Sequence, residues 1–208
     1  MASVTHYFDY KSPYAYLAQA ATFALAEEVA VEWLPYTLQI AKYLGVAELD
    51  AEGHDHIGTR NDHQWRRVKY AYMDCRREAN RRGLVIRGPR KIFDSSAAHI
   101  AFLYVRERGD FRRFHDAVFQ RFWRREFELE NPASLSALMD ECDIDSSGFP
   151  RYLRGTGRAH YASIQSDAED AGVFGVPSYL VEGELFWGYE RLARVRERLG
   201  LAPHGGPD

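Results

Sequence analysis

A strand runs into the start of a helix in the stretch Phe8-Asp9-Tyr10-Lys11-Ser12-Pro13-Tyr14-Ala15-Tyr16-Leu17-Ala18. Residues 3–10 are rich in aromatic and β-branched side chains, which is typical of a β-strand. Serine is a favoured N-cap and proline suits the first helical position, so Ser12-Pro13 predicts a helix that begins here. Residues 29–36 have the pattern of a second strand. A strand, a helix and a strand with short connections predict a βαβ unit.

Strand character returns near the end of the chain. Residues 177–182 turn at Gly183 into residues 184–187, which predicts a β-hairpin, and a closing helix is expected from Tyr189 to Leu199. The middle of the chain shows no convincing strand and has helical patterns at about 62–83, 95–108, 111–126, 134–142 and 147–170. We therefore predict an α/β protein with a thioredoxin-like fold (βαβ…ββα), formed by residues 1–40 and 172–208 and split by an all-helical insertion domain, residues 41–171.

The composition is that of an ordinary globular protein. The 208 residues are 46% hydrophobic and 27% charged, with a formal net charge of −3. A nucleic-acid or membrane footprint would need a clustered basic face, and we predict neither partner. The local arginine pairs are interleaved with acidic and aromatic residues, and we interpret them as solvated helix faces: Arg76-Arg77, Arg81-Arg82 and Arg112-Arg113.

The N-terminus and the two cysteines indicate a reducing compartment. No basic leader with an apolar segment is visible at the N-terminus, and the longest apolar stretch is far shorter than the ~20 residues that span a bilayer. Cys75 and Cys142 lie far apart, in segments with helical periodicity, and neither belongs to a C-x-x-C pair. We therefore expect free thiols and a cytoplasmic location.

The stretch around Ser12 resembles the start of the DsbA-like family. Redox members of that family carry C-P-x-C where the first helix opens, and the corresponding residues here are Ser12-Pro13-Tyr14-Ala15. Dithiol exchange needs one thiolate to attack and a second thiol to resolve the mixed disulfide, and this segment holds neither. The sequence therefore excludes a DsbA-type oxidoreductase activity at this site.

The S-P-Y pattern looks instead like that of the 2-hydroxychromene-2-carboxylate isomerases and the kappa-class glutathione transferases. This resemblance implies that Ser12 donates a hydrogen bond to the sulfur of bound glutathione and favours the thiolate. A hydrogen bond to a charged group contributes about 1.5–3 kcal/mol, and a helix N-terminus adds about 0.3–1 kcal/mol. Together they would bring a thiol pKa from ~8.5 to near 7. A role for Ser12 as an N-cap alone is the alternative.

The C-terminal segment strongly resembles the same families, in Gly172-Val173-Phe174-Gly175-Val176-Pro177-Ser178-Tyr179-Leu180-Val181 and in residues 183–192. The resemblance implies a cis peptide bond before Pro177, facing the start of the first helix. The backbone N–H and C=O of Val176 would then be free to pair with a cysteinyl peptide such as glutathione.

One turn departs from the pattern of the glutathione-binding relatives. In those relatives, a small polar residue and an aspartate after the last strand hold the γ-glutamyl end, and the corresponding residues here are Tyr189 and Glu190. Glu190 would still reach an ammonium group, whereas Tyr189 would fill the space of the γ-glutamyl arm. Another low-molecular-weight thiol therefore stays open as the cofactor.

Other residues are candidates for the walls of the site. Asn61 is the best match to an asparagine that a loop of the isomerases contributes near the substrate, and Tyr10 and Tyr14 are predicted to wall an apolar pocket. His54 and His56, with a third histidine seven residues on, match no zinc signature, and no metal is predicted. The alternatives for His54 and His56 are a general base and, by default, solvated loop side chains.

These observations predict a glutathione-dependent isomerase or transferase. It would activate a bound thiol for addition to an electrophilic, aromatic small molecule, and in the isomerase version the thiol would leave again. The resemblance also implies a homodimer. The alternative is a catalytically silent thioredoxin-fold binding module with a remodelled thiol site, which Tyr189 and Glu190 favour.

Overall fold

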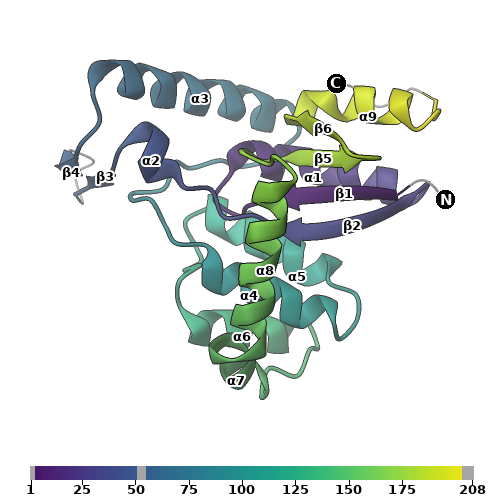
Figure 1. Ribbon diagram of the computed structural model, residues 1–208. Helices are drawn as coiled ribbons and strands as arrows, with labels where there is room; N and C mark the ends of the chain where they lie inside the picture. Colours follow the sequence, from purple (N-terminus) through teal and green to yellow (C-terminus); the bar gives the residue numbers. More distant parts are fainter. Residues whose placement is uncertain (1–2, 51–54, 203–208) are drawn as a thin grey trace.

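A four-stranded sheet lies at the centre of the protein in the computed structural model, which describes residues 3–50 and 55–202, with the backbone alone at 55–57 (Figure 1). Its order is β2-β1-β5-β6. β1 pairs in parallel with β2 and antiparallel with β5, and β5 pairs antiparallel with β6. The strands are β1 (Ser3–Phe8), β2 (Ala30–Pro35), β5 (Ser178–Val181) and β6 (Glu184–Trp187). The predicted thioredoxin-like frame is confirmed.

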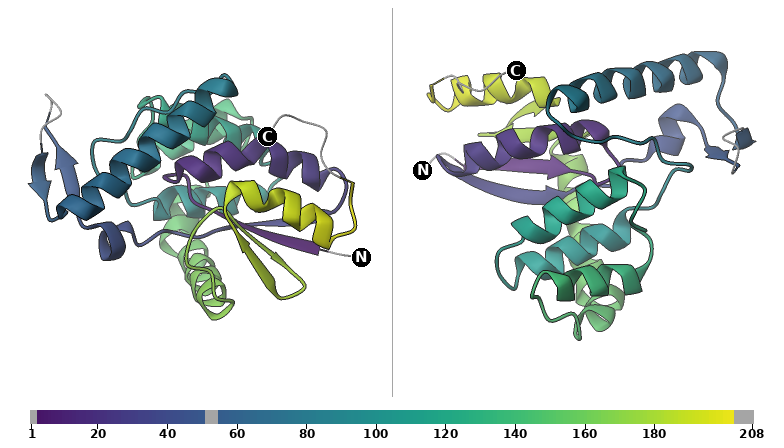
Figure 2. Two further views of the ribbon diagram at one scale, coloured as in Figure 1. Left: turned by 90° about the horizontal axis from the view of Figure 1, so that it is seen from above. Right: turned by 180° about the vertical axis from the view of Figure 1, so that it is seen from behind.

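Helix α1 (Pro13–Ala26) begins where the sequence predicts it. The Ser12 hydroxyl accepts a hydrogen bond from the Ala15 N–H at 3.2 Å, and Pro13 occupies the first turn, where a missing N–H costs nothing. α1 lies behind the sheet in Figure 1, together with α9 (Leu192–Arg198), which follows a short 3₁₀ turn at Tyr189–Arg191. The last helical turns are thus held against the same face of the sheet as α1 (Figure 2).

The segment between β2 and β5 contributes most of the helices. Its longest is α3 (Asp62–Arg81), which extends along the top of the molecule, and α8 crosses the front of the sheet (Figure 1). The other helices of this segment lie below the sheet in Figure 1, apart from one short helix that precedes α3 in the chain. The remaining elements of this segment are α2 (Ile40–Leu44), β3 (Ala47–Leu49), β4 (Asp55–Gly58), α4 (Ser96–Arg106), α5 (Arg112–Trp123), α6 (Pro132–Glu141), α7 (Phe149–Arg154) and α8 (Thr156–Asp170).

Two details of the insertion differ from the sequence prediction. The insertion is not all-helical, because β3 and β4 pair antiparallel as a second, two-stranded sheet. Strands this short carry too little alternation to be read from sequence. The single helix expected at 147–170 is two helices, which break at Gly155, where the backbone leaves the helical region at φ −116° and ψ −115°. The sequence also predicts a disordered tail at residues 202–208, and apart from Ala202 this tail lies outside the described residues.

One large core joins the sheet to the insertion. Phe8 of β1 packs edge-on against Phe102 of α4, with ring centroids 4.9 Å apart, and Tyr16 of α1 stacks on Phe119 of α5 at 5.4 Å. All four side chains belong to one cluster of buried residues. The frame and the insertion are therefore stabilised by shared apolar contacts. No helix within the described ranges is long and apolar enough to cross a membrane.

Two buried histidines lie in this core in their neutral form. His6 on β1 stacks on Tyr179 at a centroid distance of 4.7 Å, and burial lowers its pKa to about 3. His115 on α5 is also fully buried, and burial lowers its pKa well below the usual value. Neither ring can bind a second proton without bringing an unpaired charge into an apolar core.

These histidines predict a loss of stability in mild acid. The unfolded chain binds protons at both positions below about pH 6.5, and the folded chain does not, so the free energy of unfolding should fall as the pH drops from 6.5 toward 4. Each histidine contributes a slope of up to about 1.4 kcal/mol per pH unit. For the His6→Phe variant, the free energy of unfolding, measured with urea at pH 7, 6 and 5, should fall less steeply as the pH decreases. An unchanged slope would contradict the neutral assignment.

Candidate functional site

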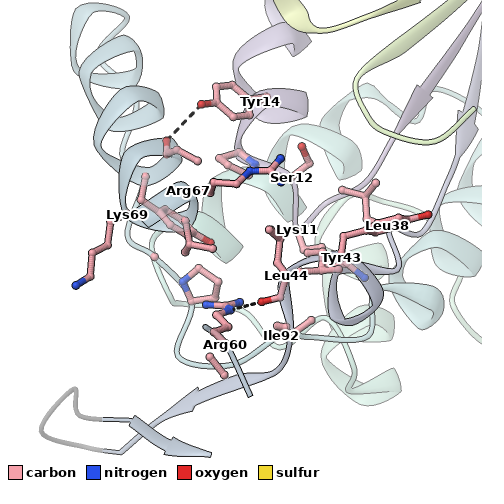
Figure 3. A pocket seen from close by; sticks show the side chains of 18 of the residues that line it. Lys11, Ser12, Tyr14, Leu38, Tyr43, Leu44, Arg60, Arg67, Lys69 and Ile92 are labelled. Atoms are coloured by element: carbon pink, nitrogen blue, oxygen red, sulfur yellow. Dashed lines mark hydrogen bonds between the residues drawn. The ribbon is translucent and has the colours of Figure 1, made fainter. Parts of the chain in front are cut away.

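The N-terminus of α1 opens onto a cavity of about 960 Å³ (Figure 3). Its walls come from the loop before α1, from α2 and α3, from residues 88–93 and from the loop that precedes β5. Its volume is at the upper end of the roughly 300–1,000 Å³ that is common for small-molecule sites. The site therefore has room for a ligand larger than a single aromatic ring.

Ser12 lies in the wall of this cavity with two hydrogen bonds already made. Its hydroxyl oxygen accepts from the Ala15 N–H, and its proton is donated to the Val176 carbonyl at 3.3 Å. The side chain is buried, with only 3% of the residue exposed. Ser12 is thus an N-cap and also a donor aimed at the opposite loop. To accept a hydrogen bond from Ser12, a ligand sulfur would have to replace the Val176 carbonyl as the acceptor.

The peptide bond between Val176 and Pro177 is cis, as the sequence predicted. Val176 lines the cavity, and its carbonyl is occupied by Ser12, while the described part of the chain provides no acceptor for its N–H. Pro177 is buried and accepts a hydrogen bond from the Gly188 N–H at 2.9 Å, which ties the loop to the end of β6. One of the two predicted backbone groups is therefore available for a ligand.

A buried cation next to Ser12 is the feature that sequence reasoning missed. Lys11 lines the cavity with its side chain 5% exposed, and its ammonium lies 3.5 Å from the Asp9 carboxylate, which is fully buried. Buried charges need a partner, and a Lys two residues from an Asp at a strand end was the available signal. This pair puts a held positive charge in the same wall as the Ser12 hydroxyl.

Both oxygens of the Asp9 carboxylate have hydrogen-bond or ion-pair partners. Its oxygens accept from the Leu38 N–H at 2.8 Å and from the Ser95 hydroxyl at 2.6 Å, and His99 Nε2 lies at 3.3 Å. Burial alone would raise the pKa of Asp9, but Lys11, then His99 and Ser95, outweigh burial and hold that pKa well below its usual range. Asp9 is therefore a carboxylate at neutral pH and fixes the position of Lys11.

Of the two tyrosines predicted to wall the pocket, one lines the cavity and the other lies in the core. Tyr14 lines the cavity, and its hydroxyl donates to Asp74 Oδ2 at 3.1 Å. Tyr10 is fully buried in the core, with its hydroxyl 3.0 Å from His115 Nδ1, and does not line the cavity. Residue type alone does not show in which direction the side chains of Tyr10 and Tyr14 point, so the sequence predicted both of them in the pocket wall.

The residues predicted for the γ-glutamyl end lie outside the cavity wall. Tyr189 stacks on Tyr14 with nearly parallel rings 5.7 Å apart, and the Arg82 guanidinium lies 5.3 Å from its centroid. Glu190 is exposed and is not among the residues of the wall. Tyr189 thus supports Tyr14 from behind, and the cavity as described contains no contact from Glu190.

The predicted loop residues divide in the same way. Asn61 is exposed and caps α3 in a reciprocal capping box with Gln64, so its role here is to begin the helix, and it does not line the cavity. His54 lies outside the described residues, and of His56 only the backbone, in β4, is described. His63 lines the cavity. No group of three potential metal-ligating residues occurs within 3–50 and 55–202.

Both thiols are unsuited to nucleophilic chemistry at neutral pH. Cys75 is buried and Cys142 is half-buried, and neither forms a disulfide. Burial raises the pKa of Cys75 to about 11 and also raises that of Cys142. The predicted free thiols are confirmed, and both are protonated at pH 7.

The fold and the site define a class: a thioredoxin-fold protein with a helical insertion, in which a serine stands opposite a cis-proline loop. Residues 3–200 match the family model of the DSBA-like thioredoxin domain, and the chain belongs to this family. A 2-hydroxychromene-2-carboxylate isomerase of Sphingobium xenophagum is 26% identical over 91% of this chain and 94% of its own length. Another of that name, from Pseudomonas putida, is 25% identical over 95% and 94%.

Solved structures agree with this assignment of the fold. The structure of a 2-hydroxychromene-2-carboxylate isomerase superimposes with a TM-score of 0.70 at 22% identity, covering 95% of this chain and 94% of the other. The predicted resemblance to this branch of the DsbA-like family is therefore confirmed.

The Asp9–Lys11 pair predicts a strong coupling between two substitutions. Lys11→Met leaves a buried carboxylate without its cation and should lower the free energy of unfolding by about 3–5 kcal/mol. Adding Asp9→Asn to Lys11→Met removes that charge and should restore part of the loss. Urea unfolding of the single and double variants measures the coupling. Purely additive effects would show that the pair makes no contribution.

Proposed function

We propose that this protein is a thiol-dependent isomerase or glutathione transferase that acts on an electrophilic, aromatic small molecule. The observation that carries the proposal is the Ser12 hydroxyl at the start of α1, facing the cis Val176–Pro177 peptide in the wall of a large cavity. The named isomerase relatives support the isomerase version. When bound, the thiol supplies a nucleophilic sulfur that adds to the substrate and, in an isomerisation, leaves again.

The residues of the chain would act by favouring the ionised sulfur. Ser12 can turn its proton from the Val176 carbonyl to a thiolate, since its oxygen lone pairs keep the bond from the Ala15 N–H. The positive end of α1 adds to this effect, whereas the Lys11 ammonium is paired with Asp9 and contributes little net charge. The free Val176 N–H would orient the ligand backbone. In this proposal, Ser12 is a donor and never a nucleophile.

The thiol end of glutathione fits these groups, but its ammonium end does not. A γ-glutamyl ammonium needs a carboxylate, and no acidic residue occurs in the described wall of the cavity. Asp74, the carboxylate behind Tyr14, already pairs with the Tyr14 hydroxyl and lies 3.6 Å from the Arg77 guanidinium. The proposal therefore rests on a thiol and leaves open that this thiol differs from glutathione.

Replacement of the Ser12 hydroxyl tests the proposal. Ser12→Ala should raise the pKa of the bound thiol by roughly one to two units, so turnover at pH 7 should fall about 10–100-fold and recover as the pH rises toward 9. Loss of the cap also costs about 1 kcal/mol of stability. Ser12→Thr, which keeps both hydrogen bonds, is the matched control. Full activity of Ser12→Ala at pH 7 would refute the assigned role.

A binding module without catalysis is the rival function. The mutual hydrogen bond of Ser12 and Val176 and the stacking of Tyr189 on Tyr14 are the observations that favour it. Such a module would bind no small thiol at millimolar concentration and would release no protons in titration calorimetry. Proton release at pH 7 that Ser12→Ala abolishes would decide for the enzyme. Sedimentation in the same buffer tests the homodimer that the resemblance implies.

The absence of a dithiol at the helix start is testable by restoring it. The protein should not accelerate the reduction of insulin disulfides, because Cys75 and Cys142 are free, protonated thiols and the helix start carries Ser12 in place of a cysteine. The double variant Ser12→Cys with Ala15→Cys places two thiols one turn apart at a helix N-terminus, which lowers thiol pKa values. This variant should form a reducible disulfide and gain insulin-reducing activity. Activity in the original chain would contradict the proposal.

A further inference from the structure

The cavity beside Ser12 is far more basic than the protein as a whole. The chain has a formal net charge of −3, yet the described wall contains no aspartate or glutamate. The cationic residues of the wall are Lys11, Arg60, Arg66, Arg67, Lys69, Arg76, Arg90, Lys91 and Arg125. This distribution is specific to the cavity, because arginines elsewhere on α3 pair with Asp74 and Glu78 on the same helix.

Several of these cations are already engaged and cannot serve a ligand freely. Lys11 pairs with Asp9, and Lys91 with Glu130 at 2.6 Å. Arg60 donates to the Leu44 carbonyl, Arg76 to the Tyr72 carbonyl and Arg125 to the Gly88 carbonyl. Because these side chains already have partners, they contribute less to the binding of an anionic ligand than their formal charges suggest.

Three arginines remain without such partners. Within the described part of the chain, no carboxylate lies within ion-pair distance of Arg66, Arg67 or Arg90. Figure 3 shows the Arg67 side chain extending from α3 into the cavity on the side of Ser12, whereas Lys69 points away. Arginine presents a planar fork of donors that matches carboxylate and phosphate. The cavity thus offers unused anion-binding groups near the proposed thiol position.

Much of the remaining wall is apolar. Leu38, Leu44, Ile92 and Phe93 contribute aliphatic and aromatic surface between the cations. A ligand that satisfies both features has an apolar body and at least two negative groups. Glutathione, with an ammonium group among its charges, is a poor match to this wall, because that ammonium would face arginines instead of a carboxylate.

We propose that the thiol ligand of this cavity is a polyanion without an ammonium group, its negative charges supplied by phosphate or by several carboxylates and bound by Arg66, Arg67 and Arg90. That the ligand carries a thiol rests on the proposed function. That the ligand is a polyanion rests on the charge of the cavity wall. Phosphate and carboxylate share the chemistry that the arginines recognise, and the experiment separates them.

The experiment is titration calorimetry at pH 7 with two matched pairs of thiols. Glutathione is compared with its desamino analogue, which lacks only the ammonium group, and 4′-phosphopantetheine with pantetheine, which lacks only the phosphate. The desamino analogue should bind about ten-fold more tightly than glutathione if carboxylates are the anions. If the anions are phosphates, 4′-phosphopantetheine should bind more tightly than pantetheine by at least that factor. Higher salt should reduce either preference.

Variants assign the preference to the cavity. Arg67→Gln should reduce the anion preference about ten-fold. Arg81→Gln removes the same charge from the same helix at an exposed position outside the cavity, and should leave the preference unchanged. Equal effects of the two variants would overturn the assignment. Circular dichroism of both confirms that the fold is retained.

The outcomes separate this inference from the proposed function. Equal binding within both thiol pairs, or no binding of any of the four, overturns the polyanion proposal. Glutathione that binds most tightly, with proton release, overturns it while the thiol-activating function stands. Polyanions that bind with the expected preference but release no proton in the original chain or in Ser12→Ala support the anion site and refute thiol activation.

Discussion

The buried Asp9 carboxylate ties three distant segments of the chain together. It lies at the end of β1, accepts hydrogen bonds from the Leu38 backbone beyond β2 and from Ser95 before α4, and faces Lys11 and His99. An ionised group in an apolar interior is stable only when all of its partners are in place. The position of the α1 N-terminus relative to the insertion therefore depends on this one side chain.

The same arrangement gives the site its electrostatic character. Because Asp9 is fully buried and Lys11 is almost so, the ammonium is held in the cavity wall instead of extending into solvent. The helix start and the Ser12 hydroxyl then act from one side of the cavity, and Arg67 of α3 acts from the other. A site built in this way favours negative charge along its whole length.

Much of the frame was predictable because local signals there agree with the global fold. Ser12-Pro13 marks a helix start, and the hairpin around Gly183 follows from its turn. Prediction was weaker for the walls of the site. Asn61 has the chemistry of a substrate ligand, but its side chain caps α3, and Tyr10 has the chemistry of a pocket wall, but its ring fills the core. Residue type alone does not tell which direction a side chain takes.

The sequence by itself determined the thioredoxin-like order of elements and the missing dithiol, because these depend on short local motifs. Its family resemblance implied that Ser12 faces the cis Val176–Pro177 peptide. The tertiary structure alone decided that the Ser12 proton is donated to the Val176 carbonyl and that Lys11 is held by Asp9. It also decided that arginines from three separate segments, residues 60–76, Arg90 and Arg125, line one cavity without a described acid. The Ser12–Val176 contact and the grouping of the arginines join residues far apart in the chain, and their distances are set by how the insertion packs on the sheet. Asp9 and Lys11 are close in sequence, but Asp9 is buried by partners far from both, Leu38 and Ser95.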